Sequence, residues 1–171
     1  LYDAFVARGL HVERVPGLGR GITGLGDLRA LAALKSRFRE FQPDVVHTHA
    51  SKAGALGRRA AAVVPTAARV HTFHGHVLEG YFPDPVSRGL VALEAMLARD
   101  TDRVLAVAHA TAEDLLRLKV VADERRLVVV PPGIDLDPFL AIAGRHGALR
   151  ELVGARADDY LVGVVGRLAE V

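Results

Sequence analysis

The stretch Ala68-Arg69-Val70-His71-Thr72-Phe73-His74-Gly75-His76 combines a short apolar run with three imidazoles. A run of this length, bounded by loop residues, predicts a buried strand. A second stretch, Val45-Val46-His47-Thr48-His49, also ends in histidine. Five of the eight histidines therefore lie at the ends of two predicted strands. Because ligands bind at the carboxyl ends of the strands in an open α/β sheet, the two stretches predict a ligand site at that edge.

Strands and helices alternate along the rest of the chain. The predicted strands cover 11–15, 45–49, 69–73, 103–108, 127–130 and 160–165. The predicted helices cover 2–8, 28–41, 51–64, 84–99, 112–119 and 148–153. We expect Asp27 to cap the second helix, and Thr111 with Asp114 to form a capping box for the fifth. This order predicts an α/β fold with a Rossmann-like parallel sheet and helices on both faces.

Two of these helices show apolar residues at helical spacing, which predicts their buried faces. The residues are Leu28, Leu31, Leu34, Phe38 and Phe41 in the helix at 28–41, and Val86, Leu90, Leu93 and Leu97 in the helix at 84–99.

The composition excludes several classes of protein. Half of the 171 residues are apolar, so a core is possible, yet no run reaches the ~18 apolar residues of a membrane span. The chain has no cysteine, which excludes disulfides and thiolate chemistry and fits a reducing, cytoplasmic compartment. The net charge of +2, with no tryptophan and three tyrosines, argues against a stacking platform for nucleic acid.

The histidine-rich segment supplies the first candidate site residues. A histidine at a strand end can offer its imidazole or its backbone carbonyl to a ligand, and Glu79 is close enough in sequence to orient the ring of His74 or His76. The alternative is a purely structural role, in which these polar residues at the start of a loop form hydrogen bonds within the protein. Zinc is the rival ligand, because two His-x-His pairs could supply imidazoles. The hydrolase pattern His-x-His-x-Asp-His is not met, since Ala50 follows His49, and we expect no metal.

Two small-residue segments are candidates for binding anions. Ser51-Lys52-Ala53-Gly54 begins a helix, where backbone N–H groups and Lys52 could meet an anion such as a phosphate; an exposed lysine at a helix start is the alternative. Gly19, Gly21 and Gly24 match the spelling of the dinucleotide fingerprint. Pro16 separates them from the preceding strand, and they precede the predicted helix instead of forming the turn into it, so we interpret them as a loop.

Several segments together resemble one enzyme family. They are 43–49, Ser51-Lys52-Ala53-Gly54, His71 to His76 with Gly80-Tyr81-Phe82, 102–107, Val130-Pro131-Pro132-Gly133-Ile134-Asp135, and Val165-Gly166-Arg167-Leu168. In this order they resemble family 4 glycosyltransferases, retaining enzymes with two Rossmann-like domains across a cleft (GT-B). The Ser-Lys-Ala-Gly and His-Thr-Phe-His-Gly-His segments resemble members that build bacterial surface polysaccharides.

The resemblance implies roles for individual residues. His74 would contact the donor sugar near the reacting carbon, and His49, Lys52, His76 and Glu79 would lie on the substrate side. Gly166 and Arg167 would contact the donor phosphates, because a guanidinium can bind a diphosphate through two bonds. The implied partners are a nucleotide-sugar donor and a saccharide or polyprenyl-linked acceptor, with no cofactor and no metal.

The basic face of the helix at 28–41 could lie on anionic lipid, which would make the protein peripheral on the cytoplasmic membrane face; a solvated face is the alternative. The basic residues are Arg29, Lys35, Arg37 and Arg39.

The resemblance also implies that the chain is a fragment. We expect an incomplete acceptor-side domain at 1–135, a linker and short helix at 136–158, and the first strand of a donor domain at 159–171. The glutamate pair that holds the nucleotide-sugar in the family lies beyond the sequence, so we expect this chain alone to be inactive. The alternatives are a sugar-nucleotide epimerase of GT-B architecture and a non-catalytic module that binds saccharide or nucleotide.

Overall fold

The computed structural model describes residues 2–19, 21–142, 148–156, 158–164 and 166. The chain divides into two units, Leu1–Pro131 and Pro132–Val171. The domain bounds at 135 and 158 remain predictions. The candidate histidines all belong to the first unit, which is described first.

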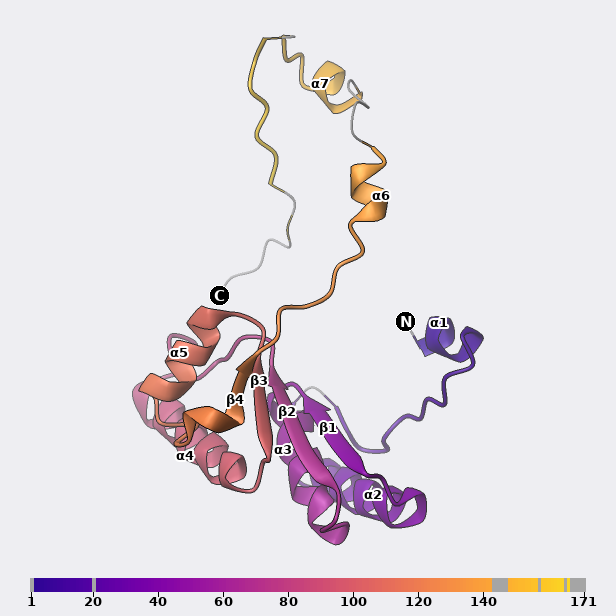
Figure 1. Ribbon diagram of the computed structural model, residues 1–171, viewed down its shortest axis with the longest axis vertical. Coiled ribbons are helices and arrows are strands. Elements are labelled where there is room, and N and C mark those ends of the chain that lie inside the picture. The colour runs from indigo at the N-terminus through magenta and orange to yellow at the C-terminus, as the bar shows by residue number, and fades with distance from the viewer. Residues whose placement is uncertain (1, 20, 143–147, 157, 165, 167–171) are drawn as a thin grey trace. The chain divides into compact units, whose positions relative to one another are not determined.

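Four parallel strands form the sheet of the first unit, in the order β1-β2-β3-β4 (Figure 1). They are β1 (Val45–His49), β2 (Ala68–Phe73), β3 (Arg103–Ala106) and β4 (Leu127–Val129). Each strand pairs with the next one along the chain, so each connection is a crossover that contains a helix or a 3-10 turn. The predicted α/β fold with a Rossmann-like parallel sheet is confirmed.

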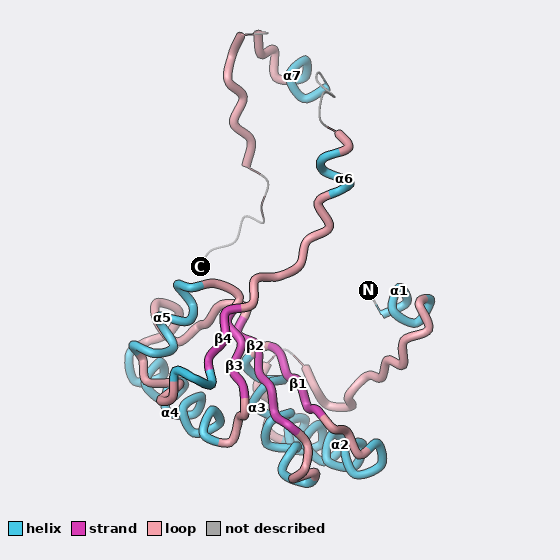
Figure 2. The backbone as a smooth tube through the Cα atoms, viewed as in Figure 1, coloured by secondary structure: helices cyan, strands magenta, loops and turns pink. Residues whose placement is uncertain are grey.

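The helices connect these strands in sequence order (Figure 2). The first unit contains α1 (Tyr2–Ala7), α2 (Leu25–Phe41), α3 (Ser51–Ala60), α4 (Asp84–Arg99) and α5 (His109–Arg117), with 3-10 turns η1 (Ala61–Val63) and η2 (Glu124–Arg126). The second unit contains α6 (Asp137–Leu140) and α7 (Ala148–Leu152). Pro65 follows α3 and η1, and Pro83 precedes α4, where a fixed φ and a missing N–H are tolerated.

One face of the sheet is packed and the other is open. Thr48, His71, Val104 and Leu127 are aligned across the strands on the packed face, whereas His49, Thr72, Leu105 and Val128 are aligned on the other face. In Figure 1, α2, α3 and α4 lie behind the strands. On the front face Val45 is 54% exposed and Val128 is 41% exposed. On the same face, towards the carboxyl end of β2, Thr72 is buried.

Two apolar clusters fill the packed face. Phe73, Val104 and Ala106 of the sheet pack with Leu115 of α5, and Leu90 and Val91 of α4 lie against them. Nearer the β1 edge, Val46 packs with Ala61 and Val64, and Phe38 of α2 covers this cluster. Burial of a Leu, Val or Phe side chain stabilises the fold by roughly 1.5–3 kcal/mol. The first cluster therefore holds α4 and α5 against the strands, and the second holds α2 and the 3-10 turn η1.

Two predicted strands are not strands in the described residues. Residues 11–15 have no ladder partner in the described structure. His11 Nε2 lies 2.8 Å from Glu13, and Glu13 pairs with Arg37 of α2 at 2.8 Å. Residues 160–164 are extended and unpaired, with Tyr160 fully exposed, and Val165 lies outside the described residues. An apolar run becomes a strand only where a neighbouring strand satisfies its backbone groups.

Two predicted helix starts are also wrong. Helix α2 begins at Leu25, and Asp27 lies in its first turn, where its carboxylate accepts the Thr23 N–H at 3.2 Å. Helix α5 begins at His109, and Asp114 binds Arg117 and His76 instead of capping the helix.

The buried faces of α2 and α4 differ from the predicted ones. Leu28 and Phe41, near the two ends of α2, are 64% and 77% exposed. In α4, Val86 and Leu93 are half-exposed while Glu94 is buried, because Glu94 pairs with the buried Arg58 of α3 at 2.5 Å.

Candidate functional site

The carboxyl ends of β1 and β2 bring His49 and His74 together. His49 is opposite Thr72 in the parallel register, and His74 follows Thr72 by two residues, which directs it to the same, open face. The His49 Nδ1 and His74 Nε2 atoms are 2.9 Å apart, a hydrogen-bond distance. The two rings are tilted by 31° with centroids 5.2 Å apart. The sequence placed both residues at this edge, and the structure joins them.

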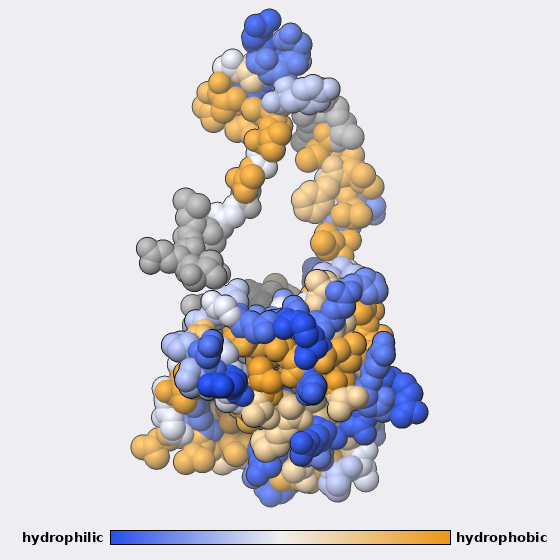
Figure 3. Space-filling model, turned by 90° about the vertical axis from the view of Figure 1, so that its left-hand side faces the viewer, coloured by the Kyte–Doolittle hydropathy of each residue, from blue (hydrophilic) through white to orange (hydrophobic). Residues whose placement is uncertain are grey.

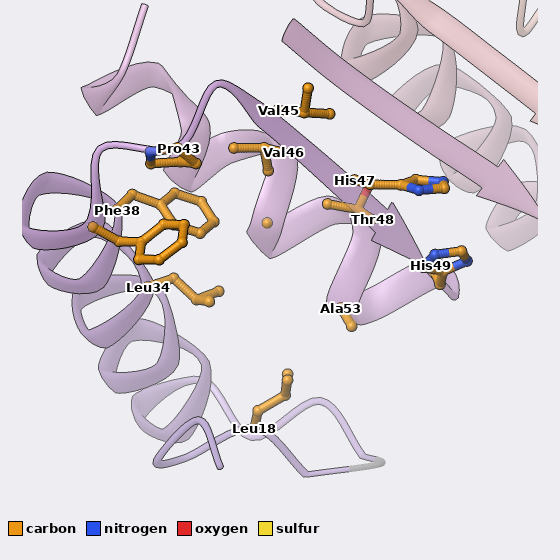
Figure 4. Close-up of a pocket in the computed structure, with 12 residues that line it drawn as sticks. Leu18, Leu34, Phe38, Pro43, Val45, Val46, His47, Thr48, His49 and Ala53 are labelled. Atoms are coloured by element: carbon orange, nitrogen blue, oxygen red, sulfur yellow. The ribbon is translucent and has the colours of Figure 1, made fainter. Parts of the chain in front are cut away.

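His47 extends this row of imidazoles. Its ring centroid lies 4.3 Å from that of His49, and its Nε2 is 2.8 Å from the Thr72 hydroxyl. Figure 4 shows both rings on the same side of β1, directed away from Phe38 and Leu34 of α2. His47 was not among the predicted site residues. The His-x-His spacing would have found it, because residues two apart on a strand share a face.

His71 has a different, structural environment. It is 1% exposed, its Nδ1 is 2.8 Å from the Thr48 hydroxyl, and its ring meets Phe73 edge-on with centroids 4.6 Å apart. Burial, followed by the nearby Arg58 charge, lowers the pKa of His71 to about 3. The ring is therefore neutral at physiological pH and contributes to the packed face of the sheet.

Gly54 lets α3 approach this buried ring. A Cβ atom at residue 54 would lie 2.4 Å from His71 Cε1, and one at Gly57 would lie 2.7 Å from Thr48 Cγ2. Both distances are shorter than carbon atoms tolerate, so glycine is required at each position for α3 to pack at this distance. The glycine of the Ser-Lys-Ala-Gly segment thus serves helix-to-sheet packing.

Lys52 reaches back to the glycine-rich loop. Its ammonium pairs with Asp27 at 2.5 Å and donates to the carbonyl oxygens of Gly19, at 3.0 Å, and Gly21. The bond from Lys52 lowers the pKa of Asp27. The loop therefore turns carbonyl oxygens toward a cation, whereas a phosphate-binding loop presents N–H groups. A role for Lys52 in acceptor binding stays a prediction, and in this structure its charge is paired.

His76 and Glu79 belong to a second network, between the loop after β2 and α5. His76 Nε2 is 3.1 Å from Asp114, and its Nδ1 accepts the Leu78 N–H at 3.4 Å. Arg117 donates to both Glu79 oxygens, at 2.9 and 2.5 Å, and to Asp114 at 2.6 Å. The bonds from Arg117 lower the pKa of both carboxyl groups. Asp114, not Glu79, therefore orients a ring, and sequence spacing could not reveal a partner 38 residues away.

Two pockets flank these networks. One, of about 370 Å³, lies between α2, α3 and the β1 edge, with His47 and His49 on its wall (Figure 4). The other, of about 500 Å³, lies between Leu78, Phe82 and α4. Figure 3 shows that apolar surface, in orange, remains exposed beside hydrophilic residues on the side of the unit seen there. Both pockets combine apolar walls with polar groups, as small-molecule sites do.

The predicted phosphate-binding pair lies in the second unit. Gly166 is described and exposed, whereas Arg167 lies outside the described residues. Their contact with donor phosphates stays a prediction.

The described part of the chain lacks the features of a metal centre and of a membrane span. It contains no group of three or more His, Cys, Asp or Glu residues arranged to hold a metal ion. No helix there has the length and apolar character needed to cross a bilayer.

Comparisons with known proteins identify one enzyme family. The profile of Glycosyltransferase Family 4 matches residues 2–138. An Escherichia coli relative, a UDP-Gal:alpha-D-GlcNAc-diphosphoundecaprenol alpha-1,3-galactosyltransferase, is 30% identical over 90% of this chain and 40% of its own length. Relatives from Xylanimonas cellulosilytica and Kineococcus radiotolerans, both D-inositol 3-phosphate glycosyltransferases, are 37% and 34% identical over 73% and 94% of this chain and 32% and 36% of their own lengths. The chain thus spans about two fifths or less of these curated relatives.

Proposed function

The chain belongs to glycosyltransferase family 4, and from this premise we propose that it forms the acceptor-side part of an enzyme that moves a sugar from a nucleotide-sugar to a saccharide or lipid-linked acceptor, with retention. The observation that carries the proposal is the exposed His74 ring, held against His49 at the carboxyl ends of β1 and β2. This is the edge where ligands bind in open α/β sheets. We place the enzyme in surface polysaccharide biosynthesis, on the cytoplasmic side.

The chemistry assigned to this edge is positioning and charge stabilisation. His74 would hold the donor sugar near its reacting carbon while the nucleotide diphosphate departs. Among the described residues no carboxylate lies within 4 Å of the His49 or His74 ring, so we assign no general base there. The acceptor hydroxyl would pass its proton to the departing phosphate on the same face, which gives retention. Arg167 would neutralise that phosphate, and no metal or cofactor is assigned.

The acceptor is proposed to carry phosphate. The names of both kinds of relative include a phosphorylated acceptor, a diphosphoundecaprenol-linked sugar in one and inositol 3-phosphate in the other. Lys52 could meet such a phosphate only if its ion pair with Asp27 opens. Asp27→Asn keeps the shape and removes the competing charge, so it should lower the KM for a phosphorylated acceptor. An unchanged KM would remove Lys52 from the acceptor site.

The deciding experiment uses the full-length enzyme and its His74→Ala variant. Loss of a group that stabilises the transition state typically lowers kcat by ~100-fold or more, and we expect a loss of that size. His109→Ala is the matched control, because His109 is an exposed residue at the start of α5. Near-normal turnover by His74→Ala would refute the assignment. Epimerised nucleotide-sugar as the product of the full-length enzyme would refute the transferase. Tight nucleotide-sugar binding by the 171-residue chain alone would favour the non-catalytic binding module.

A further inference from the structure

The bond between His49 and His74 joins two imidazoles and therefore constrains their protons. A neutral imidazole has one N–H donor and one acceptor nitrogen, and a protonated one has two donors. The bond thus needs at least one neutral ring and is lost when both rings are protonated. His76 meets the Asp114 carboxylate instead, and a protonated ring can keep that bond.

His49 is the better anchored member of the pair. It is the last residue of β1, paired with Thr72 of β2, and its ring rests against that of His47 at 4.3 Å. His74 follows the last residue of β2, and Gly75 beyond it has a φ of +121°, which turns the chain away. The strand therefore fixes the His49 ring, and the His74 ring depends on its partner for its orientation.

The surroundings of His49 disfavour its charged form. On the open face the facing titratable groups are His47 and the two rings themselves, and on the packed face they are His71 and Arg58. Within the described residues, no salt bridge to a carboxylate reaches either ring of the pair. Burial, followed by the charges of His47 and His74, lowers the pKa of His49.

We propose that His49 is a positioning residue that fixes the tautomer of His74: the His49 Nδ1–H donates to His74 Nε2, so that the His74 Nδ1–H is the donor offered to the sugar. The sugar contact rests on the proposed function, whereas the pairing of the rings does not. The resemblance places His49 on the substrate side, and neither the family match nor the relatives' names assign it a positioning role.

NMR of the 171-residue chain tests the pairing without any activity. With ¹⁵N-labelled histidine at pH 7.5, we expect a scalar coupling across the bond between His49 Nδ1 and His74 Nε2, with the proton on Nδ1. In His49→Ala the coupling is lost and His74 should populate both tautomers, whereas His109→Ala leaves it unchanged. A missing coupling in the unmodified chain, or His74 protonated at Nε2 there, would overturn the proposal.

Kinetics of the full-length enzyme test the consequence for turnover. His49→Ala should lower kcat by about 3- to 10-fold, the range expected for one lost hydrogen bond, with little change in the KM for the acceptor. His49→Asn places an N–H donor at the position of Nδ1 and should restore at least half of kcat. Equal losses in the Ala and Asn variants would refute the positioning role. If the coupling is present but His74→Ala is fully active, the proposed function fails and the ring pairing stands.

Discussion

Gly54→Ala tests the close approach of α3 to β2. The added Cβ would lie 2.4 Å from His71 Cε1 and 2.9 Å from its Nδ1. The His71 ring is 1% exposed and bonded to Thr48, so it cannot swing aside. The helix must therefore move away from the sheet, or the Thr48 bond must break.

The expected cost follows from two opposing effects. Overpacking in a rigid core costs about 1–3 kcal/mol, and the short distance to a fixed ring favours the upper end. Alanine in place of glycine inside a helix gains ~1 kcal/mol. We expect Gly54→Ala to lower the free energy of unfolding by about 2 kcal/mol. Gly89→Ala in α4 is the control, because its Cβ would meet no atom within 4 Å, and it should raise stability by about 0.5–1 kcal/mol.

Urea unfolding of the chain, with matched m-values, measures both variants. A double-mutant cycle then isolates the contact: on a His71→Ala background, Gly54→Ala should lose most of its cost because the clashing ring is absent. If Gly54→Ala were as stabilising as Gly89→Ala, α3 would not lie as close to the sheet as described, and the account of the Ser-Lys-Ala-Gly segment would be wrong.

Three further predictions concern the buried pair, the buried histidine and the sheet edge. Glu94→Ala should destabilise the fold by ~3–5 kcal/mol in urea unfolding, because it leaves the buried Arg58 unpaired; the exposed Glu113→Ala should change stability by less than ~0.5 kcal/mol. His71 binds a proton near pH 6.5 in the unfolded state but only near pH 3 in the folded state. The free energy of unfolding should therefore fall with decreasing pH in that window, by up to ~1.4 kcal/mol per pH unit. A His71→Gln variant that keeps the same slope between pH 6.5 and 5 would contradict this. The unpaired edge of β1 should make the chain self-associate, and Val45→Lys should shift its sedimentation toward the monomer. A monomeric unmodified chain would contradict association through this edge.

The strands of the sheet were predictable because their signal is local. The strands at 45–49 and 69–73 are short apolar runs with proline or small residues nearby, and the structure places β1 and β2 within one residue of them. Strand prediction failed at 11–15, which holds only two apolar residues, and at 160–164, because neither segment has a neighbouring strand in the described residues to pair with. Pairing is a property of the whole sheet, so a single segment cannot reveal it.

The contacts of the candidate site were not predictable, because their partners are distant in sequence. Lys52 finds its charge partner 25 residues earlier, in Asp27, and Glu94 finds Arg58 36 residues away. Helical spacing identified the apolar faces of the helices. It could not show that an ion pair with Arg58 of α3 would bury the face of α4 that carries Glu94. Each of these pairs changes the interpretation of a motif residue: Lys52 has a paired charge, and α4 buries a carboxylate.

Strand parity explains why neighbouring histidines have different roles. Alternate residues of β2 face opposite sides, so His71 and Phe73 enter the packed face while Thr72 and His74 face the open side. The first histidine is therefore neutral and structural, and the second is exposed and joined to His49. Once the bounds of a strand are known, the alternation of its side chains is enough to predict which histidine is buried and which is exposed. The partner of the exposed ring requires the register as well, because a shift of one residue between β1 and β2 would turn His49 to the packed face and leave His74 without its imidazole partner.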